Sequence, residues 1–297
     1  MKKEKPKPLS IILINWNNYE MTKDCILSIR KNTFYPNYEI FLVDNGSIDG
    51  SIERLGKELP FLKIIKNKKN MGFPYALNQG YRQANGYYLA HINNDAIVLE
   101  NCFEEAIKVL ESDKKIAVAG FREISEEQAN NSEKLKIIRA EKNQEKMTLP
   151  VGWVTKKQMI GKIGYLDAEY FSPIYGEEAD WNFRARNMGY KIVRASKANV
   201  VHYSSVDTKK HLGKRKYLVL INYHRLRAML FNLSIINLLR FTPGLGLILL
   251  NSFWQGTFLQ ILKSYWLNLK DWRLILEQRK GKRGYIPFKE PKFTIIK

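Results

Sequence analysis

Polar side chains follow an apolar run at residues 87–90, in the sequence His91-Ile92-Asn93-Asn94-Asp95. The apolar run is typical of a buried strand, and open α/β sheets bind ligands at the carboxyl ends of their strands. The Asp95 carboxylate suits Mg²⁺ or Mn²⁺, and the two asparagine amides suit a sugar or a diphosphate. A helix N-cap is the alternative interpretation, with a helix over 98–110.

Further acids and a histidine are candidates for the same chemistry. Asp44 follows a predicted strand and suits a contact to a base or a ribose, and His202 is a candidate to hold a divalent ion together with Asp95. Glu177 and Glu178 are adjacent acids at a predicted helix start, where one can act as a general base toward a hydroxyl. Each has a structural alternative: a turn cap for Asp44, a helix N-terminus for the glutamates and a buried structural role for His202.

Strands and helices alternate in the part of the chain that must position these residues. The apolar runs at 9–14, 38–43, 62–65 and 87–90 predict strands, and helices are expected over 20–31, 51–59 and 76–84. This order predicts a parallel sheet with right-handed crossovers, so the polar strand ends share one edge.

The following segment is less regular. We expect strands at 116–120 and 151–154, a helix over 156–163, a helix from Gly176 to Met188, and short strands at 190–194 and 199–203. Residues 123–146 are strongly charged and predict a mobile insertion or lid.

Positive charge is concentrated in the last third of the chain. The net charge is +20, and residues 206–297 hold 18 Lys and Arg against 4 Asp and Glu, which is +14. Residues 241–262 carry no charge and are long enough to span a bilayer, but Pro243, Gly244 and Gly246 interrupt them. Membrane-surface or re-entrant association, a soluble helical cap and a true span remain open. The basic tail 278–297 is expected to be peripheral.

The remaining composition bounds the location of the protein. Only two cysteines are present, far apart and without metal-type spacing, which favours a reducing compartment. The basic start of the chain lacks the apolar run of a secretory signal. We therefore expect a cytoplasmic protein, peripheral on the inner face of the cell membrane.

The sequence contains no Gly-x-x-x-x-Gly-Lys phosphate loop, no Gly-x-Gly-x-x-Gly after the first strand and no Gly-x-Ser-x-Gly elbow. The order of its motifs instead resembles the family 2 glycosyltransferases, specifically the rhamnosyltransferase-like inverting enzymes with a GT-A fold. The resemblance covers residues 9–205 and rests on these strings: Ile14-Asn15-Trp16-Asn17, Asp44-Asn45-Gly46-Ser47 with Asp49-Gly50-Ser51, Asn70-Met71-Gly72-Phe73, Asn93-Asn94-Asp95, Gly176-Glu177-Glu178-Ala179-Asp180 and Val201-His202.

The resemblance implies a fold and a set of roles. The expected fold is α/β, a GT-A domain over 1–205 with a Rossmann-like, mostly parallel sheet flanked by helices, and a helical, membrane-associating extension over 206–297. Asp95 and His202 would bind the metal, Mg²⁺ or Mn²⁺, and Glu178 would be the general base, with Glu177 and Asp180 as alternates. Donor-binding roles are implied for Asn15, Trp16, Asp44, Asn45, Asn70, Gly72, Asn93, Asn94 and Gly152.

The resemblance therefore implies an inverting hexosyltransferase. It would move a sugar from a UDP- or dTDP-linked donor to a glycan acceptor, lipid-linked at the membrane, in cell-surface polysaccharide or glycoconjugate synthesis. Two alternatives stay open. A nucleic-acid-binding protein would explain the basic charge, although acids and amides dominate the predicted cleft. An inactive sugar-nucleotide-binding module would explain the single carboxylate in Asn93-Asn94-Asp95.

Overall fold

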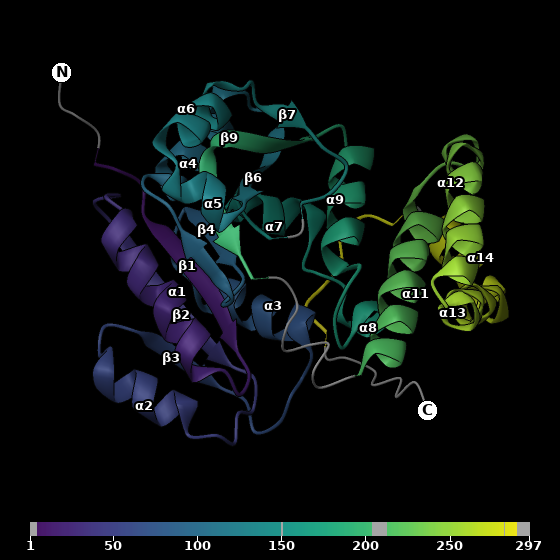
Figure 1. Cartoon of the computed structure of the whole chain (residues 1–297), viewed down its shortest axis with the longest axis horizontal. Coiled ribbons are helices and arrows are strands. Elements are labelled where there is room, and N and C mark those ends of the chain that lie inside the picture. Colours follow the sequence, from purple (N-terminus) through teal and green to yellow (C-terminus); the bar gives the residue numbers. More distant parts are fainter. Residues whose placement is uncertain (1–4, 150, 204–212, 282, 290–297) are drawn as a thin grey trace.

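One sheet organises the molecule (Figure 1). The computed structural model describes residues 5–149, 151–203, 213–281 and 283–289. The nine strands of the sheet follow the order β3-β2-β1-β4-β8-β6-β9-β5, with β7 attached to β9. The strands are β1 (Leu9–Asn15), β2 (Tyr38–Asp44), β3 (Lys63–Lys66), β4 (Tyr88–Ile92), β5 (Ala96–Val98), β6 (Ile116–Ile124), β7 (Gln144–Glu145), β8 (Gly152–Lys156) and β9 (Lys191–His202).

The first four strands form the predicted parallel half of the sheet. β1 lies between β2 and β4 and is parallel to both, and β3 is parallel to β2. β1 is apolar except for Ser10 and its last residue, Asn15, because helices cover both of its faces. Helices α1 (Tyr19–Asn32), α2 (Ser51–Glu58) and α4 (Cys102–Ser112) pack on one face. Helices α3 (Phe73–Gln83), α7 (Lys157–Ile163) and α9 (Glu177–Asn187) pack on the other.

The second half of the sheet is mixed. β8 is antiparallel to both β4 and β6, whereas β6 and β9 are parallel. β9 is one strand of 12 residues where the sequence predicts two short strands. The pairing with β6 shifts register between Gly120 and Arg122, so residues 195–198 of β9 bulge without leaving the sheet. The α/β sheet flanked by helices is confirmed, with antiparallel strands added to its parallel half.

Residues 123–146 differ from the predicted mobile insertion. They contain α5 (Glu126–Asn130), α6 (Ser132–Ala140) and β7. Ser125 begins α5 with a capping box, and the Arg122 guanidinium binds both carboxylate oxygens of Glu141, at 2.7 and 2.8 Å. Ile138 of α6 is buried against Ile124 and Val201. A single apolar contact region is enough to pack this charged segment on the sheet. Its composition therefore did not predict that the segment is ordered.

Over residues 213–281 the C-terminal region contains four helices: α11 (Lys214–Asn232), α12 (Ile235–Trp254), α13 (Phe258–Lys270) and α14 (Trp272–Lys280). α11 packs against α9 and the short helix α8 (Ala168–Phe171), and Phe231 of α11 is buried together with Phe171 and Phe183. The uncharged run 241–262 is divided between α12 and α13 by a turn at Gly256, where φ is +65°. Among the described residues, α12 is the one helix long and apolar enough to cross a membrane.

The tail is not peripheral over the residues that the structure describes. Ile286 forms a β-bridge with Gly164, and the Phe288 ring lies between the rings of Tyr75 and Tyr165, at centroid distances of 5.2 and 5.5 Å. Arg283 is 2% exposed. We name residues 283–289 the C-terminal strap. The expected division at residue 205 stays a prediction, and the strap and α11 both pack on the sheet domain.

Candidate functional site

The ends of β1 and β2 are joined by a buried polar network. Asn15 and Asp44 are neighbours in the parallel pairing, and both are buried. The Asn15 amide donates to the hydroxyl oxygens of Ser51 and Ser47, at 2.8 and 3.1 Å, and lies 3.4 Å from an Asp44 carboxylate oxygen. Its carbonyl oxygen accepts from the Thr22 hydroxyl at 2.9 Å. All the polar atoms of Asn15 are thus used to fix the two strand ends.

The network continues to the end of β4. The Asn94 amide donates to the Thr22 hydroxyl at 2.8 Å. A chain of hydrogen bonds therefore runs from Asn94 through Thr22 to Asn15 and Asp44, and connects three strand ends. The sequence analysis did not identify Thr22, because it lies on the inner face of α1 and belongs to no motif.

Asn45 holds the loop that precedes α3. Its side-chain amide donates to the side-chain oxygen of Asn70 at 3.0 Å. The side-chain oxygen of Asn45 accepts from the backbone N–H of Met71, also at 3.0 Å. Asn70 in turn accepts from the backbone N–H of Gly72 at 2.9 Å. Gly72 begins α3 with φ +84°, a conformation that favours glycine. These predicted donor-binding residues do lie together, at the β2 end of the polar edge.

Trp16 directly follows β1 and is half-buried. Asn17, the next residue, has φ +52° and accepts from the backbone N–H of Ile48 at 2.8 Å through its side chain. Its own backbone N–H donates to Ser47 at 2.9 Å. The loop that carries Trp16 is therefore fixed to the loop after β2, which leaves part of the indole accessible at the edge of the sheet.

Asp95 and His202 meet where β4 and β9 end. The Nε2 atom of His202 lies 3.1 Å from an Asp95 carboxylate oxygen and 3.2 Å from the Asn93 amide nitrogen. Glu123, at the end of β6, lies 3.6 Å from Nδ1 of the same ring. Burial favours the neutral ring, but the hydrogen bond and charge of Asp95, with Glu123, raise the pKa of His202. The sequence analysis missed Glu123 because it assigned that residue to an insertion.

His91 and Gly152 lie behind this pair, inside the sheet. The His91 ring packs edge-on against Phe73 and Trp153, and burial lowers its pKa to about 4, so the ring is neutral. Its Nε2 lies 3.1 Å from the Asn93 carbonyl oxygen. A Cβ at Gly152 would lie 2.5 Å from the His91 carbonyl oxygen. The structure thus places Gly152 at a close contact between β8 and the end of β4, and its donor-binding role stays a prediction.

Glu177 and Glu178 begin α9, as expected. Gly176 precedes them with φ +84°, and a Cβ there would lie 2.7 Å from the carbonyl oxygen of His224 in α11. Glu177 is 3% exposed, and one of its carboxylate oxygens has no hydrogen-bond partner among the described residues. Burial, and then the neighbouring Glu178, raise the pKa of Glu177 well above its ordinary value. Glu178 is half-buried, and burial raises its pKa as well, against opposing backbone hydrogen bonds and the charge of Arg225.

Asp180, the other alternate base, is enclosed by ion pairs and hydrogen bonds. Its carboxylate is fully buried and accepts from Nε of Arg184 at 2.9 Å and from the Asn232 amide at 2.8 Å. The guanidinium of Arg283 lies 3.0 Å from the same carboxylate and also binds Asp167. Burial alone raises the pKa of Asp180, but the two arginines lower it below its ordinary value. Asp180 therefore anchors α9 to α11 and to the strap.

No group of three His, Cys, Asp or Glu side chains that could hold a metal occurs in the part of the chain that the structure describes. Asp95 and His202 nevertheless present a carboxylate oxygen and an imidazole nitrogen 3.1 Å apart, which are suitable donors for Mn²⁺ or Mg²⁺. Two protein ligands leave open coordination positions that the oxygens of a diphosphate can fill. The pair fits a metal that is bound together with its substrate.

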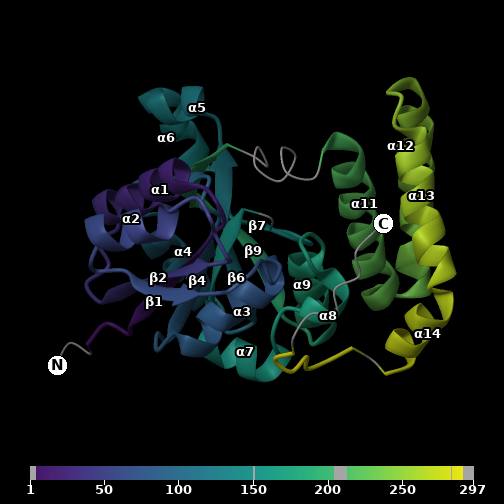
Figure 2. The same ribbon diagram turned by 90° about the horizontal axis from the view of Figure 1, so that it is seen from below.

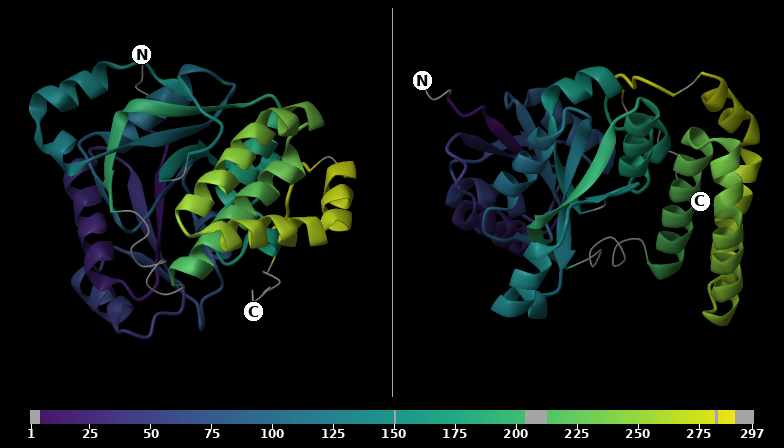
Figure 3. Two further views of the ribbon diagram at one scale, coloured as in Figure 1. Left: turned by 45° about the vertical axis from the view of Figure 1, so that its right-hand side comes forward. Right: turned by 90° about the horizontal axis from the view of Figure 1, so that it is seen from above.

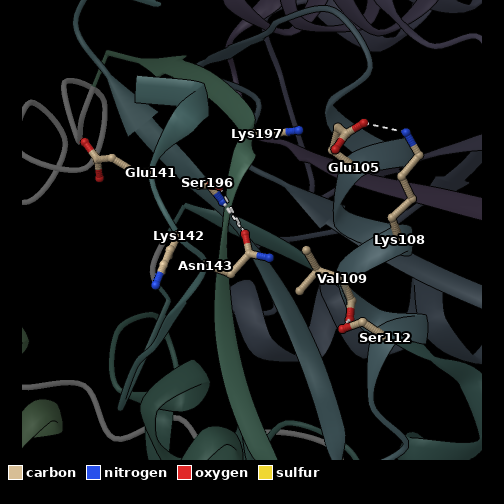
Figure 4. A pocket seen from close by; sticks show the side chains of 9 residues that line it. All are labelled: Glu105, Lys108, Val109, Ser112, Glu141, Lys142, Asn143, Ser196 and Lys197. Carbon is tan, nitrogen blue, oxygen red and sulfur yellow. Dashed lines mark hydrogen bonds and ion pairs between the residues drawn. The ribbon is translucent and has the colours of Figure 1, made fainter. Parts of the chain in front are cut away.

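Two surface cavities lie away from the polar edge. One of about 380 Å³ is lined by residues of α4 and of the segments 141–143 and 196–197, where the Asn143 carbonyl oxygen accepts from the backbone N–H of Ser196 at 2.9 Å (Figure 4). The other, of about 590 Å³, lies between the end of α9 and the start of α12. Neither contains a residue predicted for the site.

The chain resembles known proteins in both sequence and fold. It is 32% identical over 115 residues to an uncharacterized glycosyltransferase of Haemophilus influenzae, covering 38% of this chain and 35% of the relative. It is 31% identical over 114 residues to the amylovoran biosynthesis glycosyltransferase AmsE of Erwinia amylovora, covering 37% of this chain and 42% of AmsE. The matches cover 29% to 42% of the length of the first three curated relatives.

Two solved structures share the fold at 15% identity. The mannosyltransferase PcManGT of Pyrobaculum calidifontis, in complex with GDP-Man and Mn²⁺, aligns with a TM-score of 0.60 over 94% of this chain and 84% of that one. GalNAc-T7 with UDP, GalNAc and Mn²⁺ aligns with a TM-score of 0.59 over 76% of this chain and 48% of that one. The GT-A fold is thereby confirmed.

The sequence profile of Glycosyl transferase family 2 matches residues 10–166, which hold β1 to β8 and every strand end of the polar edge except that of β9. With this match added to the fold and the motif order, the chain belongs to glycosyl transferase family 2.

Proposed function

We propose that the chain is an inverting glycosyltransferase that moves a sugar from a nucleotide diphosphate donor, UDP- or dTDP-linked, to a hydroxyl of a glycan acceptor. The observation that carries the proposal is the pairing of Asp95 with His202 at the polar edge, on a sheet that also positions the acidic start of α9. Sugar transfer needs charge stabilisation for the diphosphate leaving group and a base for the acceptor hydroxyl; Asp95 with His202 would hold the metal for the first, and the acids of α9 offer the second.

The nucleotide is proposed to bind at the ends of β1 and β2. Trp16 offers a partly exposed indole for the base, and Asp44 offers a carboxylate at the strand end. Asn70 and Gly72, in the loop that Asn45 holds, are proposed to contact the ribose and the diphosphate. Asn15, Asn45 and Asn94 act by holding the loops, because their side chains are already hydrogen-bonded to those loops.

Asp95 and His202 are proposed to hold a divalent metal, Mg²⁺ or Mn²⁺, and Asn93 fixes the histidine ring. When bound, the metal supplies positive charge that stabilises the departing diphosphate. Glu178 takes the proton of the acceptor hydroxyl while the hydroxyl oxygen attacks the anomeric carbon of the donor sugar. The bond to the diphosphate breaks on the opposite face, which inverts the anomeric centre. Glu177 is enclosed and carries a strongly raised pKa, so it is less suited to this step.

The acceptor is proposed to be a lipid-linked glycan at the inner face of the cell membrane, in cell-surface polysaccharide or glycoconjugate synthesis. Support comes from the exposed apolar helix α12, which is 6% buried, and from the likeness to AmsE. A water-soluble acceptor would not require an apolar surface of this kind.

Nucleotide binding tests the donor site directly. In calorimetric titrations of UDP, dTDP and GDP, we expect one nucleotide to bind more tightly with Mn²⁺ than without, because the diphosphate completes the metal coordination. Asp95→Ala is expected to weaken metal-dependent binding by about tenfold or more. Asp113→Ala removes an exposed carboxylate, paired with Lys191, and serves as the matched control. Metal-independent binding, or equal binding by the Asp95 variant, would contradict the proposed metal site.

The pH dependence of kcat tests the base. A general base must be ionised, so activity is expected above the raised pKa of Glu178 and lost as the pH falls through it. The acidic limb of the profile should therefore lie above the ordinary pKa of a glutamate. Glu178→Asp should move this limb while keeping measurable turnover, because the acid is kept and its reach changes. A profile with no acidic limb above that ordinary value would rule out Glu178 as the base.

A further inference from the structure

The exposed apolar side chains of the molecule are concentrated on the last helices. Of the 24 large apolar side chains that are exposed in the described residues, 15 lie between Ile235 and Leu276. The most exposed of them include Trp254 at 80%, Leu259 at 72% and Phe253 at 64%. Soluble monomeric proteins rarely expose so many large apolar side chains in one region, and large apolar patches mark docking surfaces.

α12 and α13 form a hairpin, with Gly256 at its turn. The Tyr265 hydroxyl of α13 donates to the Leu245 carbonyl oxygen of α12 at 3.0 Å. α13 is held to the rest of the protein by Asn268, which donates to the Tyr223 carbonyl oxygen of α11 at 3.0 Å. Figures 2 and 3 show the hairpin on the outer side of α11, with its turn projecting beyond the start of that helix. Phe253 and Trp254 directly precede this turn.

The charge around the hairpin has one sign. The sequence contains no Asp or Glu between Gly213 and Lys270, and eight Lys and Arg: Lys214, Arg215, Lys216, Arg225, Arg227, Arg240, Lys263 and Lys270. The first three are exposed at the start of α11, at the same end of the molecule as the hairpin turn (Figure 2). An apolar turn beside a cluster of cations is complementary to the surface of an anionic bilayer.

The hairpin is too short to cross a bilayer and return. The strap that follows α14 packs on the sheet domain, so both ends of the hairpin stay on the side of that domain. A crossing by α12 would need α13 to cross back, but its 13 residues extend only about 20 Å as a helix, against a hydrocarbon core of roughly 30 Å. Lys263 would also be placed in the core. Insertion is therefore limited to the turn and the exposed side of the two helices.

We propose that the turn of the α12–α13 hairpin inserts into one leaflet of an anionic lipid bilayer, while Lys214, Arg215 and Lys216 contact the lipid phosphates. The inference deepens the proposed function, on which it rests only for the presence of an acceptor at that bilayer. The docking itself does not depend on sugar transfer.

Vesicle binding tests the proposal. The full chain is sedimented with vesicles of phosphatidylcholine alone and of phosphatidylcholine mixed with phosphatidylglycerol. Binding to the mixed vesicles is expected, weakening as salt is added. The double variant Phe253→Ser/Trp254→Ser should reduce the affinity for vesicles by about tenfold or more, because it removes two aromatic side chains that are proposed to insert into the bilayer. Lys214→Glu/Lys216→Glu should reduce it by about fivefold or more for the mixed vesicles. Phe34→Ser, at an equally exposed phenylalanine outside the hairpin, is the matched control and should bind normally.

Several results would overturn the docking. Two of them are an absence of binding to both kinds of vesicle and unchanged binding by the Phe253/Trp254 variant. A third is protein in cell membranes that high salt and alkali do not release and that needs detergent for extraction, which would indicate a span. A lipid-free dimer that this variant dissociates, without vesicle binding, would assign the surface to a second copy of the chain. Nucleotide titration on the same samples reports the donor site independently, so failure of docking and failure of the transferase proposal can be distinguished.

Discussion

Glu178→Gln is expected to lower kcat by about 10²- to 10⁴-fold, because it removes the group proposed to accept the acceptor proton. The glutamine keeps the size of the side chain at the start of α9, so the helix and the nearby loops should remain in place. Binding of the nucleotide with Mn²⁺ is expected to be unchanged, since that site lies at the strand ends and not on α9. Steady-state kinetics with calorimetry on the same preparation would measure both quantities.

Glu177→Gln is the matched control for this prediction. Burial raises the pKa of Glu177 and favours its protonated form, which an amide resembles in charge and size. The expected loss in kcat is therefore much smaller than for Glu178. If the Glu177 variant loses more activity than the Glu178 variant, the assignment of the base is reversed; if both remain near the native rate, the base lies elsewhere.

Arg283→Ala is expected to lower the free energy of unfolding by about 3–5 kcal/mol, because it leaves two buried carboxylates without their shared partner. Asp167 and Asp180 are 3% and 0% exposed, and the Arg283 guanidinium binds both. Asp180 keeps Arg184, whereas Asp167 loses its ion pair with Arg283. Urea denaturation followed by circular dichroism would measure the loss of stability as a lower midpoint.

Lys289→Ala is the control, because Lys289 also belongs to the strap and pairs with Glu169 at 3.3 Å but is exposed. Exposed pairs contribute about 0–1 kcal/mol, so this variant should unfold close to the native midpoint. Arg283→Lys keeps the positive charge, but an ammonium group lacks the planar fork that binds both carboxylates. Its urea midpoint should therefore lie between those of Arg283→Ala and Lys289→Ala. Equal midpoints for the native chain and Arg283→Ala would show that the strap contributes nothing to stability.

The sequence predicted the parallel half of the sheet because its strands are covered on both faces. Residues 9–14 are then apolar except for Ser10, and further polar residues begin where the strand ends. The same logic predicted that Asn15, Asp44 and Asn94 would meet. A local pattern was sufficient wherever one element carries both the signal and the residue.

Long-range contacts were not predictable in this way. The strap is held by an ion pair between Arg283 and Asp167, 116 residues apart, and by the Phe288 ring between two tyrosine rings, and neither contact leaves a periodic pattern in the tail. The sequence also did not separate Glu178 from Asp180, since both are acids within one turn of α9. Only the arginines that come from α9 itself and from the strap show that Asp180 is occupied. Thr22 was missed because it belongs to no motif, and Glu123 because its segment was assigned to an insertion.

The order in which the chain is synthesised has a consequence for the charge network of α9. The sheet strands, α9 and α11 precede Arg283, and so does the whole apolar hairpin. Domains fold as their residues emerge during synthesis, whereas contacts between distant residues form late. The nascent chain thus exposes its apolar hairpin before Arg283 is added, and the ion pairs of Asp167 and Asp180 with Arg283 form only after that hairpin has been synthesised.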